Sequence, residues 1–307
     1  MSEPAGRLER LARDGRFVVT AEVVPPRSGN LDPLTKQARG LVGYADAVNV
    51  TDNPTASAHM SPLAGVAALV DAGIEPILQL TTRDRNRLAL TADLLGAWAL
   101  GARNLLCLSG DPVSVGDDPG AAEVRDLDVR DLVRLATGLR EGRGLGSGGP
   151  VEAAPRFYVG VADSPLAAGY DPGRLEAKLD AGAGFVQTQI VFDGDAIERW
   201  AEVVRARGVF ERATVIAGVA PLRSAAQARY LDEQLPGVSV PASIIDELDR
   251  AGDGAEAEGV RLTSAIVERL RAIQGVAGIH VVGLGRERAV RRLIDATGLA
   301  PRPVVLP

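Results

Sequence analysis

The chain has 307 residues, with 34 lysine and arginine residues against 40 aspartate and glutamate residues, giving a formal charge of −6. Hydrophobic residues make up 46% and charged residues 24%, as in ordinary globular proteins, which argues against a disordered chain. The acidic balance disfavours a nucleic-acid partner, because phosphate contacts need a basic surface. The N-terminal segment is charged, and no stretch approaches the roughly 20 apolar residues of a membrane span. We therefore expect a cytoplasmic protein without nucleic-acid or membrane partners.

Reactive side chains are few. The sequence contains one cysteine, two histidines and two lysines, which are Cys107, His59, His280, Lys36 and Lys178. A single thiol excludes a disulfide within the chain, and a structural zinc site needs about four nitrogen or sulfur ligands. Neither histidine lies near a G-x-S-x-G elbow, which argues against a Ser-His-Asp hydrolase. His59 lies in a loop and His280 inside the last predicted strand, with no partner suggested for either, so both are expected to be structural and no metal site is predicted. Chemistry must use carboxylates, amides, hydroxyls, the backbone or a cofactor.

Short runs rich in valine and isoleucine alternate with helical patterns along the chain. The predicted strands are 17–24, 46–51, 75–81, 103–109, 156–163, 185–191, 213–219 and 278–283. The predicted helices are 31–43, 61–72, 85–100, 129–140, 172–182, 195–207, 223–233, 243–274 and 286–297. Eight alternating units in about 250–300 residues favour a single (β/α)8 TIM barrel of class α/β over residues 1–307, with residues 1–16 as a helical lead-in.

An open, doubly wound sheet is the alternative, but it favours a glycine-rich first turn. The first strand instead runs into EVVPPRSGN, where two prolines oppose a tight turn into a helix. Gly144, Gly146 and Gly149 match G-x-G-x-x-G, yet they follow a helix, so 141–155 is predicted to be a flexible glycine-rich loop. Within 85–100, Leu88, Leu95 and Trp98 recur near helical spacing and are expected to form the apolar face, with Arg87 and Asp93 off it.

In such barrels the site lies at the carboxyl ends of the strands. The period of two places Thr20 and Glu22 on the lumen side of the first strand, because the wholly apolar face should pack on the helices. The same reasoning pairs Asn49 with Thr51 and Gln187 with Gln189. Polar side chains that converge on one mouth are costly unless something polar binds there.

Glu22 is the sharpest candidate, because a carboxylate among valine and alanine is rare unless it is paired. Desolvation there would suit it for general-acid work near neutral pH, although an ion pair with a lumen arginine is the alternative. Gly110 and Asp111 close the fourth strand, where glycine lets a ligand approach the backbone. For Asp111, a turn cap before proline is an equally good interpretation.

Lys178 and Asp171 lie on one predicted helix, where a solvated lysine and an N-cap aspartate are the simpler interpretations. Arg83 and Arg85 follow the third strand in TTRDRNR. Two arginines at a helix start can hold a phosphate, and a solvated helix start capped by Asp84 is equally compatible with the sequence.

The sequence resembles the methylenetetrahydrofolate reductase family from about residue 17 to 297. The matching segments are TAEVVPP, AVNVTDNP, LCLSGDP, KLDAGAGFVQTQIVFD and GVAPLRSAAQ, of which the fourth is the most specific. The run QLTTRDRNRLALTADLLGA is closer to the branch of acetogenic and related bacteria than to the enterobacterial branch.

The resemblance implies a barrel that reduces 5,10-methylenetetrahydrofolate to 5-methyltetrahydrofolate through a flavin, FAD or FMN, with NAD(P)H as donor. It implies Glu22 as the acid that opens the imidazolidine ring, and Asp111 as a residue that contacts the pterin and tunes the flavin. It also implies that the substrate is contacted by Gln189, Gln227 and Arg286. The flavin would be contacted by Thr51, Gln79, Gly110, Asp171 and Lys178.

Some positions differ from the enterobacterial pattern, which has histidine at Gln79, arginine at Ser109 and an aromatic residue after strand five, where this chain reads VADSP. A flavin-dependent reductase therefore has two alternatives. One is a reductase that takes hydride directly from a nicotinamide or deazaflavin, and the other is a folate-binding barrel without turnover. Some relatives work with a second subunit, so a homo-oligomer or an accessory reductase subunit is compatible with the sequence.

Overall fold

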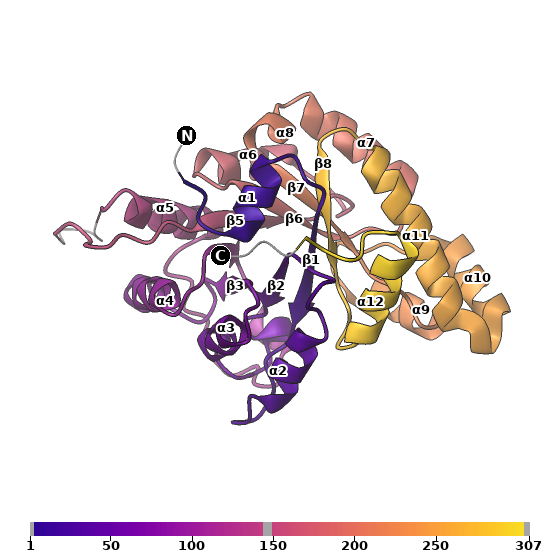
Figure 1. Ribbon diagram of the computed structural model, residues 1–307, viewed down its shortest axis with the longest axis horizontal. Coiled ribbons are helices and arrows are strands. Elements are labelled where there is room, and N and C mark those ends of the chain that lie inside the picture. The colour runs from indigo at the N-terminus through magenta and orange to yellow at the C-terminus, as the bar shows by residue number, and fades with distance from the viewer. Residues whose placement is uncertain (1–2, 144–148, 304–307) are drawn as a thin grey trace.

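The computed structural model describes residues 3–143 and 149–303, and its eight parallel strands close into a barrel that helices surround (Figure 1). Each strand pairs with the next along the chain, and β1 pairs with β8. The strands are β1 (Val18–Val23), β2 (Ala47–Val50), β3 (Pro76–Thr81), β4 (Asn104–Leu108), β5 (Tyr158–Asp163), β6 (Phe185–Ile190), β7 (Thr214–Val219) and β8 (Val276–Val281). The predicted (β/α)8 barrel is confirmed.

Local signals in the sequence start the outer helices. Asn86, Asp128, Asp193 and Ser224 each accept a backbone N–H in the first turn of the helix that follows. The longer helices are α2 (Asp32–Arg39), α3 (Pro62–Asp71), α4 (Arg87–Ala99), α5 (Val129–Arg140), α6 (Pro172–Asp180), α7 (Gly194–Arg205), α9 (Ala225–Gln234), α10 (Ala242–Ala251), α11 (Ala255–Ala272) and α12 (Glu287–Ala296). The short ones are α8 (Val209–Arg212), η1 (Pro54–Ala56), η2 (Val113–Val115) and η3 (Gly252–Gly254).

Two expectations about the helices are wrong. The segment predicted as one helix, 243–274, is broken by η3, where Gly252 takes a φ of +52° that ends α10. On α4, Leu90 and Leu94 are fully buried, whereas Leu88 and Leu95 are 71% and 39% exposed. Of the predicted face, Trp98 does pack against the core. The sheet fixes which stripe of α4 faces inward, and a helix with several leucines offers more than one stripe.

The period of two along β1 separates the outer core from the lumen, as predicted. Val19, Ala21 and Val23 pack with the helices, while Val18 joins a lumen layer that contains Phe185 and Tyr158. Gly160 makes room in that layer, since a Cβ on it would lie 2.1 Å from the Phe185 ring.

Helix α1 (Arg7–Arg13) covers the amino ends of the strands, near the centre of the view in Figure 1. Its Leu8 and Leu11 complete the lumen layer. The Glu75 carboxylate accepts the N–H groups of Arg7 and Leu8 at 2.6 and 2.9 Å, which fixes the start of the helix. This end of the barrel is therefore closed, and the opposite end stays available for a site.

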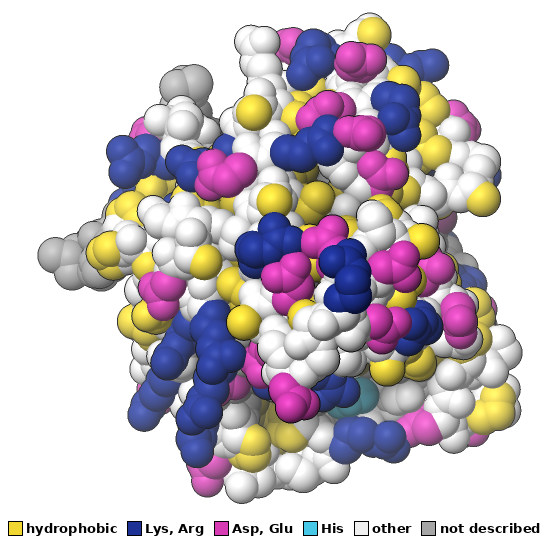
Figure 2. Space-filling view, turned by 90° about the vertical axis from the view of Figure 1, so that its right-hand side faces the viewer, with side chains coloured by type: hydrophobic (Ala, Val, Ile, Leu, Met, Phe, Trp, Pro, Cys, Tyr) yellow, Lys and Arg dark blue, Asp and Glu magenta, His cyan; other side chains and the backbone are white. Residues whose placement is uncertain are grey.

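On the face shown in Figure 2, basic and acidic side chains are interspersed and apolar ones are scattered between them. Within residues 3–143 and 149–303, no helix is long and apolar enough to cross a membrane. Residues 144–148, which include most of the predicted G-x-G-x-x-G segment, lie outside the described residues.

Candidate active site

A cavity of about 490 Å³ opens at the carboxyl ends of the strands. Its walls come from the tips of β1 to β6 and β8 and from the loop after α9. Among the predicted site residues, those that line it are Glu22, Thr51, Gln79, Gly110, Asp111, Lys178 and Gln189. Closure of the barrel thus brings together side chains from five strand ends and from α6.

A chain of buried hydrogen bonds crosses the lumen below this cavity. Asn49 and Gln187 pair through their amides at 2.7 and 3.2 Å, and Gln187 Nε2 donates to Thr20 Oγ1 at 3.1 Å. Thr20 Oγ1 lies 3.0 Å from His280 Nδ1. A threonine hydroxyl that accepts from Gln187 can donate to Nδ1, and in that tautomer the ring proton is on Nε2.

That ring nitrogen faces the predicted acid. His280 Nε2 lies 3.7 Å from Glu22 Oε2, with side-chain exposures of 7% and 17%. The partner of Glu22 is therefore a histidine and not the lumen arginine that was the alternative in the sequence. An imidazole N–H beside the carboxyl group can stabilise its anion after it has given up a proton.

The tip of β2 presents an unpartnered hydroxyl. Thr51 is 5% exposed, and its Oγ1 has no hydrogen-bond partner within the described residues. Beside it, Asp52 accepts both the N–H and the hydroxyl of Thr81, at 2.8 and 2.9 Å. A buried hydroxyl without a partner is costly, so Thr51 is suited to a polar ligand atom.

The tip of β4 carries Asp111 on Gly110, whose φ is +77°. Asp111 is exposed, and its Oδ2 accepts the Thr55 N–H across the mouth at 3.0 Å. The carboxylate therefore ties the tip of β4 to the loop after β2 and does not cap its own turn. Its other carboxylate oxygen, Oδ1, can accept a hydrogen bond from a ligand.

Gln189 lies within an irregularity in the pairing of β6 with β7, between Gln187 and Ile190. Its Oε1 accepts the Ile190 N–H at 2.9 Å, and its Nε2 donates to the Pro236 carbonyl at 3.1 Å. These two bonds hold the amide in a fixed orientation. One N–H and one carbonyl lone pair remain for a planar ligand with complementary groups.

Asp163 and Lys178 lie on the far side of the mouth. Asp163 is 7% exposed and accepts the Tyr170 hydroxyl at 2.9 Å, while Trp200 Nε1 donates to that hydroxyl at 2.8 Å. Burial raises the pKa of Asp163 despite these bonds and the nearby Lys178. Lys178 Nζ donates to the Ala162 carbonyl at 2.6 Å, and burial lowers its pKa. Lys178 is thus a lining residue of the cavity, not a solvated one.

A second cavity of about 360 Å³ adjoins the mouth and shares Ser109, Val129 and Lys178 with it. Its wall carries four cationic side chains, Arg125, Arg130, Arg174 and Lys178. The three arginines are ion-paired with Glu123, Asp128 and Asp171, respectively, all at exposed or half-exposed positions. A phosphate bound here would replace one of these exposed ion pairs, since guanidinium groups bind phosphate and carboxylate in the same way.

Three predicted site residues lie outside the mouth cavity. Asp171 is the N-cap of α6 and accepts the Gly173 N–H at 2.9 Å, as the simpler interpretation had it. Gln227 accepts the Arg223 N–H at 3.0 Å in the first turn of α9. Arg286 pairs with Glu256 at 3.0 Å and shares a small separate pocket with Gln227. Their ligand roles stay predictions.

Arg83 and Arg85 do not present a phosphate site. Arg85 pairs with Asp52 and Asp93, and Arg83 is 2% exposed with its donors on protein acceptors. The alternative of a solvated helix start capped by Asp84 is also wrong. The side chains of Arg83 and Arg85 are only 2% and 16% exposed, and the residue that caps α4 is Asn86.

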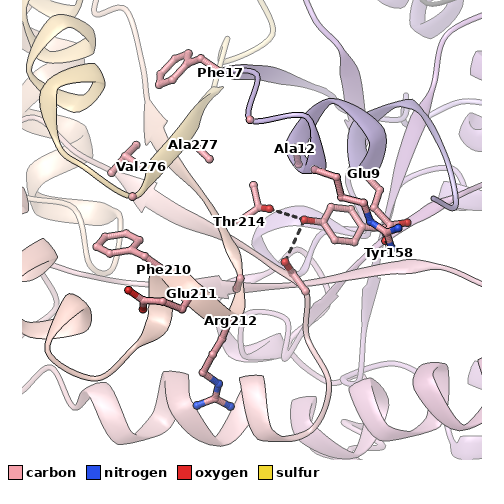
Figure 3. Close-up of a pocket in the computed structure, with 15 residues that line it drawn as sticks. Glu9, Ala12, Phe17, Tyr158, Phe210, Glu211, Arg212, Thr214, Val276 and Ala277 are labelled. Carbon is pink, nitrogen blue, oxygen red and sulfur yellow. Dashed lines mark hydrogen bonds and ion pairs between the residues drawn. The ribbon is translucent and has the colours of Figure 1, made fainter. Parts of the chain in front are cut away.

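A further cavity of about 560 Å³ lies at the amino ends of the strands (Figure 3). Its Tyr158 hydroxyl bonds to Thr214 and to the Gly184 carbonyl, at 2.7 and 3.0 Å. This end of a barrel serves stability, so the polar mouth is the candidate site. In the described part of the chain, no cluster of three or more His, Cys, Asp or Glu residues could hold a metal ion.

Sequence reasoning missed His280, which was expected to have no role in the site. The signal that could have found it is the period of two: His280 occupies the same lumen face of β8 that Thr20 occupies on β1, and the two residues are register partners. Register between the first and last strands is not available from local patterns.

Comparison with known proteins agrees with this geometry. The family model described as methylenetetrahydrofolate reductase matches residues 7–298. A probable methylenetetrahydrofolate reductase (NADPH) from Caenorhabditis elegans is 25% identical over 95% of this chain and 44% of its own length. The 5,10-methylenetetrahydrofolate reductase of Pectobacterium carotovorum is 23% identical over 94% of this chain and 92% of its own length.

Among solved structures, an uncharacterised Clostridium thermocellum protein, described as binding two copies of 5-methyl-5,6,7,8-tetrahydrofolic acid, superimposes with a TM-score of 0.65 at 13% identity. It covers 96% of this chain and 100% of its own, and this likeness shows the fold alone. The chain spans less than half the length of several eukaryotic relatives that it matches. Because the family model extends across nearly all of the barrel, this chain belongs to the methylenetetrahydrofolate reductase family.

Proposed function

We propose that this chain reduces 5,10-methylenetetrahydrofolate to 5-methyltetrahydrofolate. The observation that carries the proposal is Glu22 at the base of the mouth cavity, with His280 Nε2 at 3.7 Å. The substrate needs one proton to open its five-membered imidazolidine ring and one hydride to convert the resulting iminium carbon to a methyl group. The relatives named as methylenetetrahydrofolate reductases support the same reaction.

Glu22 would deliver that proton to the ring nitrogen that departs, and the His280 N–H would stabilise the carboxylate that remains. Asp111 and Gln189 would orient the pterin, whose edge carries both donors and acceptors that match a carboxylate oxygen and an amide. The lumen chain of Asn49, Gln187 and Thr20 keeps the histidine ring in one orientation. Gln227 and Arg286, beside the mouth, stay predicted contacts for the remainder of the folate.

The residues present fit a flavin with a phosphate-bearing tail, FAD or FMN. The unpartnered Thr51 hydroxyl offers a polar contact at the mouth, and Gly110 lets a ring approach the β4 backbone. The basic cavity next to Lys178 would hold the phosphates. When bound, the flavin would accept hydride from NAD(P)H and pass it to the folate. Gln79 and Lys178 would contact the flavin from the cavity wall, and Asp171 from the start of α6.

A second candidate keeps the folate reaction and takes hydride directly from a nicotinamide or deazaflavin. Ser109 stands where the enterobacterial pattern has arginine, and the tip of β5, which ends in the buried Asp163, lacks the aromatic residue usual after strand five. A buried carboxyl group offers no stacking surface for an isoalloxazine ring.

The test is a visible spectrum of the purified protein, identification of any flavin released by heat, and turnover of methylenetetrahydrofolate with NADH and NADPH. Bound flavin with turnover supports the first candidate, and turnover without flavin bands supports the second. Glu22→Gln should keep ligand binding and reduce turnover by about 100-fold or more. Wild-type protein that neither binds nor reduces folate with any donor would overturn the proposal.

A further inference from the structure

Arg83 lies directly behind the mouth, at the end of β3. Its guanidinium meets acceptors from three strand tips. Nε and Nη2 bind the Asp84 carboxylate at 2.6 and 2.7 Å, Nη1 donates to the Asp111 carbonyl at 3.0 Å, and Nη2 donates to the Asn53 carbonyl at 3.3 Å. Only a planar fork with several N–H groups can satisfy acceptors in these directions at once.

The loop after β2 is strained where Arg83 holds it. Asn53 and Thr55 have φ values of 44° and 51°, in the left-handed region that residues other than glycine seldom adopt. Asn53 is held by the Arg83 bond to its carbonyl and by its own Nδ2, which donates to Asp84 at 3.2 Å. Thr55 is held by its N–H bond to Asp111.

The tip of β4 rests on the same side chain. A Cβ on Gly110 would lie 3.1 Å from Arg83 Cβ and 3.3 Å from Nη1, so the two residues are in direct contact. The Arg83 carbonyl also accepts the Val124 N–H at 2.8 Å, which anchors the long loop after β4. Every part of Arg83 is therefore engaged with a segment that borders the site.

We propose that Arg83 is a positioning residue for folate: it fixes the loops after β2 and β4 so that Asp111 meets the pterin at a set distance. This inference rests on the proposed function. Arg83 itself is too deeply buried to touch a ligand. The pKa of Asp84 is lowered chiefly by its bond to Arg83, in agreement with a firm ion pair at this point.

The test compares Arg83→Lys with Arg87→Lys. Arg87 begins α4 four residues after Arg83 and pairs with Asp126 at the surface, with 57% of its side chain exposed, so it is a matched control outside the mouth. Lysine at 83 keeps the positive charge beside Asp84 and loses the fork. For each variant we would measure the melting temperature, the Kd for 5-methyltetrahydrofolate, and KM and kcat for the reduction, all well below the melting temperature.

Arg83→Lys is expected to remain folded, to bind 5-methyltetrahydrofolate about tenfold or more weaker, and to lose kcat, since small misplacements of catalytic groups cost up to about 100-fold. Arg87→Lys should stay within about twofold of wild type. If Arg83→Lys does not fold, Asp84→Asn replaces it, because the amide keeps the shape and loses half of the ion pair.

A lower melting temperature with unchanged Kd, KM and kcat would mean a purely structural role and would overturn the inference. Unchanged values throughout would overturn it as well. If the wild-type protein reduces folate while Arg83→Lys gives either of these results, only the role of Arg83 is rejected and the proposed function stands. If the wild-type protein does not bind folate, the proposed function and the role of Arg83 are rejected together.

Discussion

The ring of His280 is held between Thr20 and Glu22, with Nδ1 3.0 Å from the threonine hydroxyl and Nε2 3.7 Å from the carboxylate. Thr20 and His280 are 260 residues apart in the sequence and are paired where β1 meets β8. The pairing of β1 with β8, which closes the barrel, thus brings together the residues of the proposed acid site.

Replacing His280 with glutamine should lower turnover by about tenfold or more and leave folate binding near the wild-type value. The reason is that Glu22 loses the N–H that stabilises its anion, while the contacts at the mouth stay in place. Steady-state kinetics with a folate titration measures both quantities. His59→Gln is the control, because the His59 ring bonds to the Ser57 carbonyl outside the cavity. Equal turnover in both variants would contradict the role.

Thr51→Val should leave the free energy of unfolding unchanged or raise it, because the replaced hydroxyl is buried without a partner. The same change should weaken binding of folate or flavin. Thr81→Val is the matched control, since its hydroxyl donates to Asp52 at 2.9 Å, and it should cost about 1–3 kcal/mol. Urea denaturation and ligand titration separate the two effects. A destabilised Thr51→Val would mean that the hydroxyl has a partner.

Asp163→Asn should flatten the pH dependence of stability. Because burial raises the folded-state pKa of Asp163, the folded protein binds its proton more tightly than the unfolded chain does. Stability is therefore lost as pH rises from the unfolded value of about 3.9 through the raised folded value. Tyr170 and Lys178 face this carboxyl group and remain in the variant. Melting temperatures at a series of pH values measure the slope, with the exposed Asp180→Asn as control.

Cys107 should react with a disulfide reagent such as DTNB only when the protein unfolds. It is buried in β4, and burial raises the pKa of its thiol, so little thiolate forms at neutral pH. The expected rate in native buffer follows the unfolding rate, and denaturant should expose one thiol per chain. Rapid modification of the native protein would contradict this burial.

The strand and helix periods alone predicted the barrel, because alternating short apolar runs and amphipathic segments have few other ways to bury their faces. The ends of the predicted strands placed Glu22, Thr51 and Asp111 at one end of the barrel, since the carboxyl ends of parallel strands share one edge. What local patterns could not provide is the partner of each residue. Spacing within a segment specifies a face, but register between distant strands and the aim of a long side chain depend on the whole packed core.

Arg83 and His280 illustrate that division. In the sequence, Arg83 is an arginine at a helix start and His280 is a histidine within a strand. Only the closed barrel buries Arg83 against the Asn53 and Asp111 carbonyls, about 30 residues away on either side along the chain. Only the pairing of β8 with β1 turns His280 toward Glu22. The sequence by itself determined the fold and the end of the barrel that holds the site, and the tertiary structure decided which groups meet there, because those contacts come from strand register and closure.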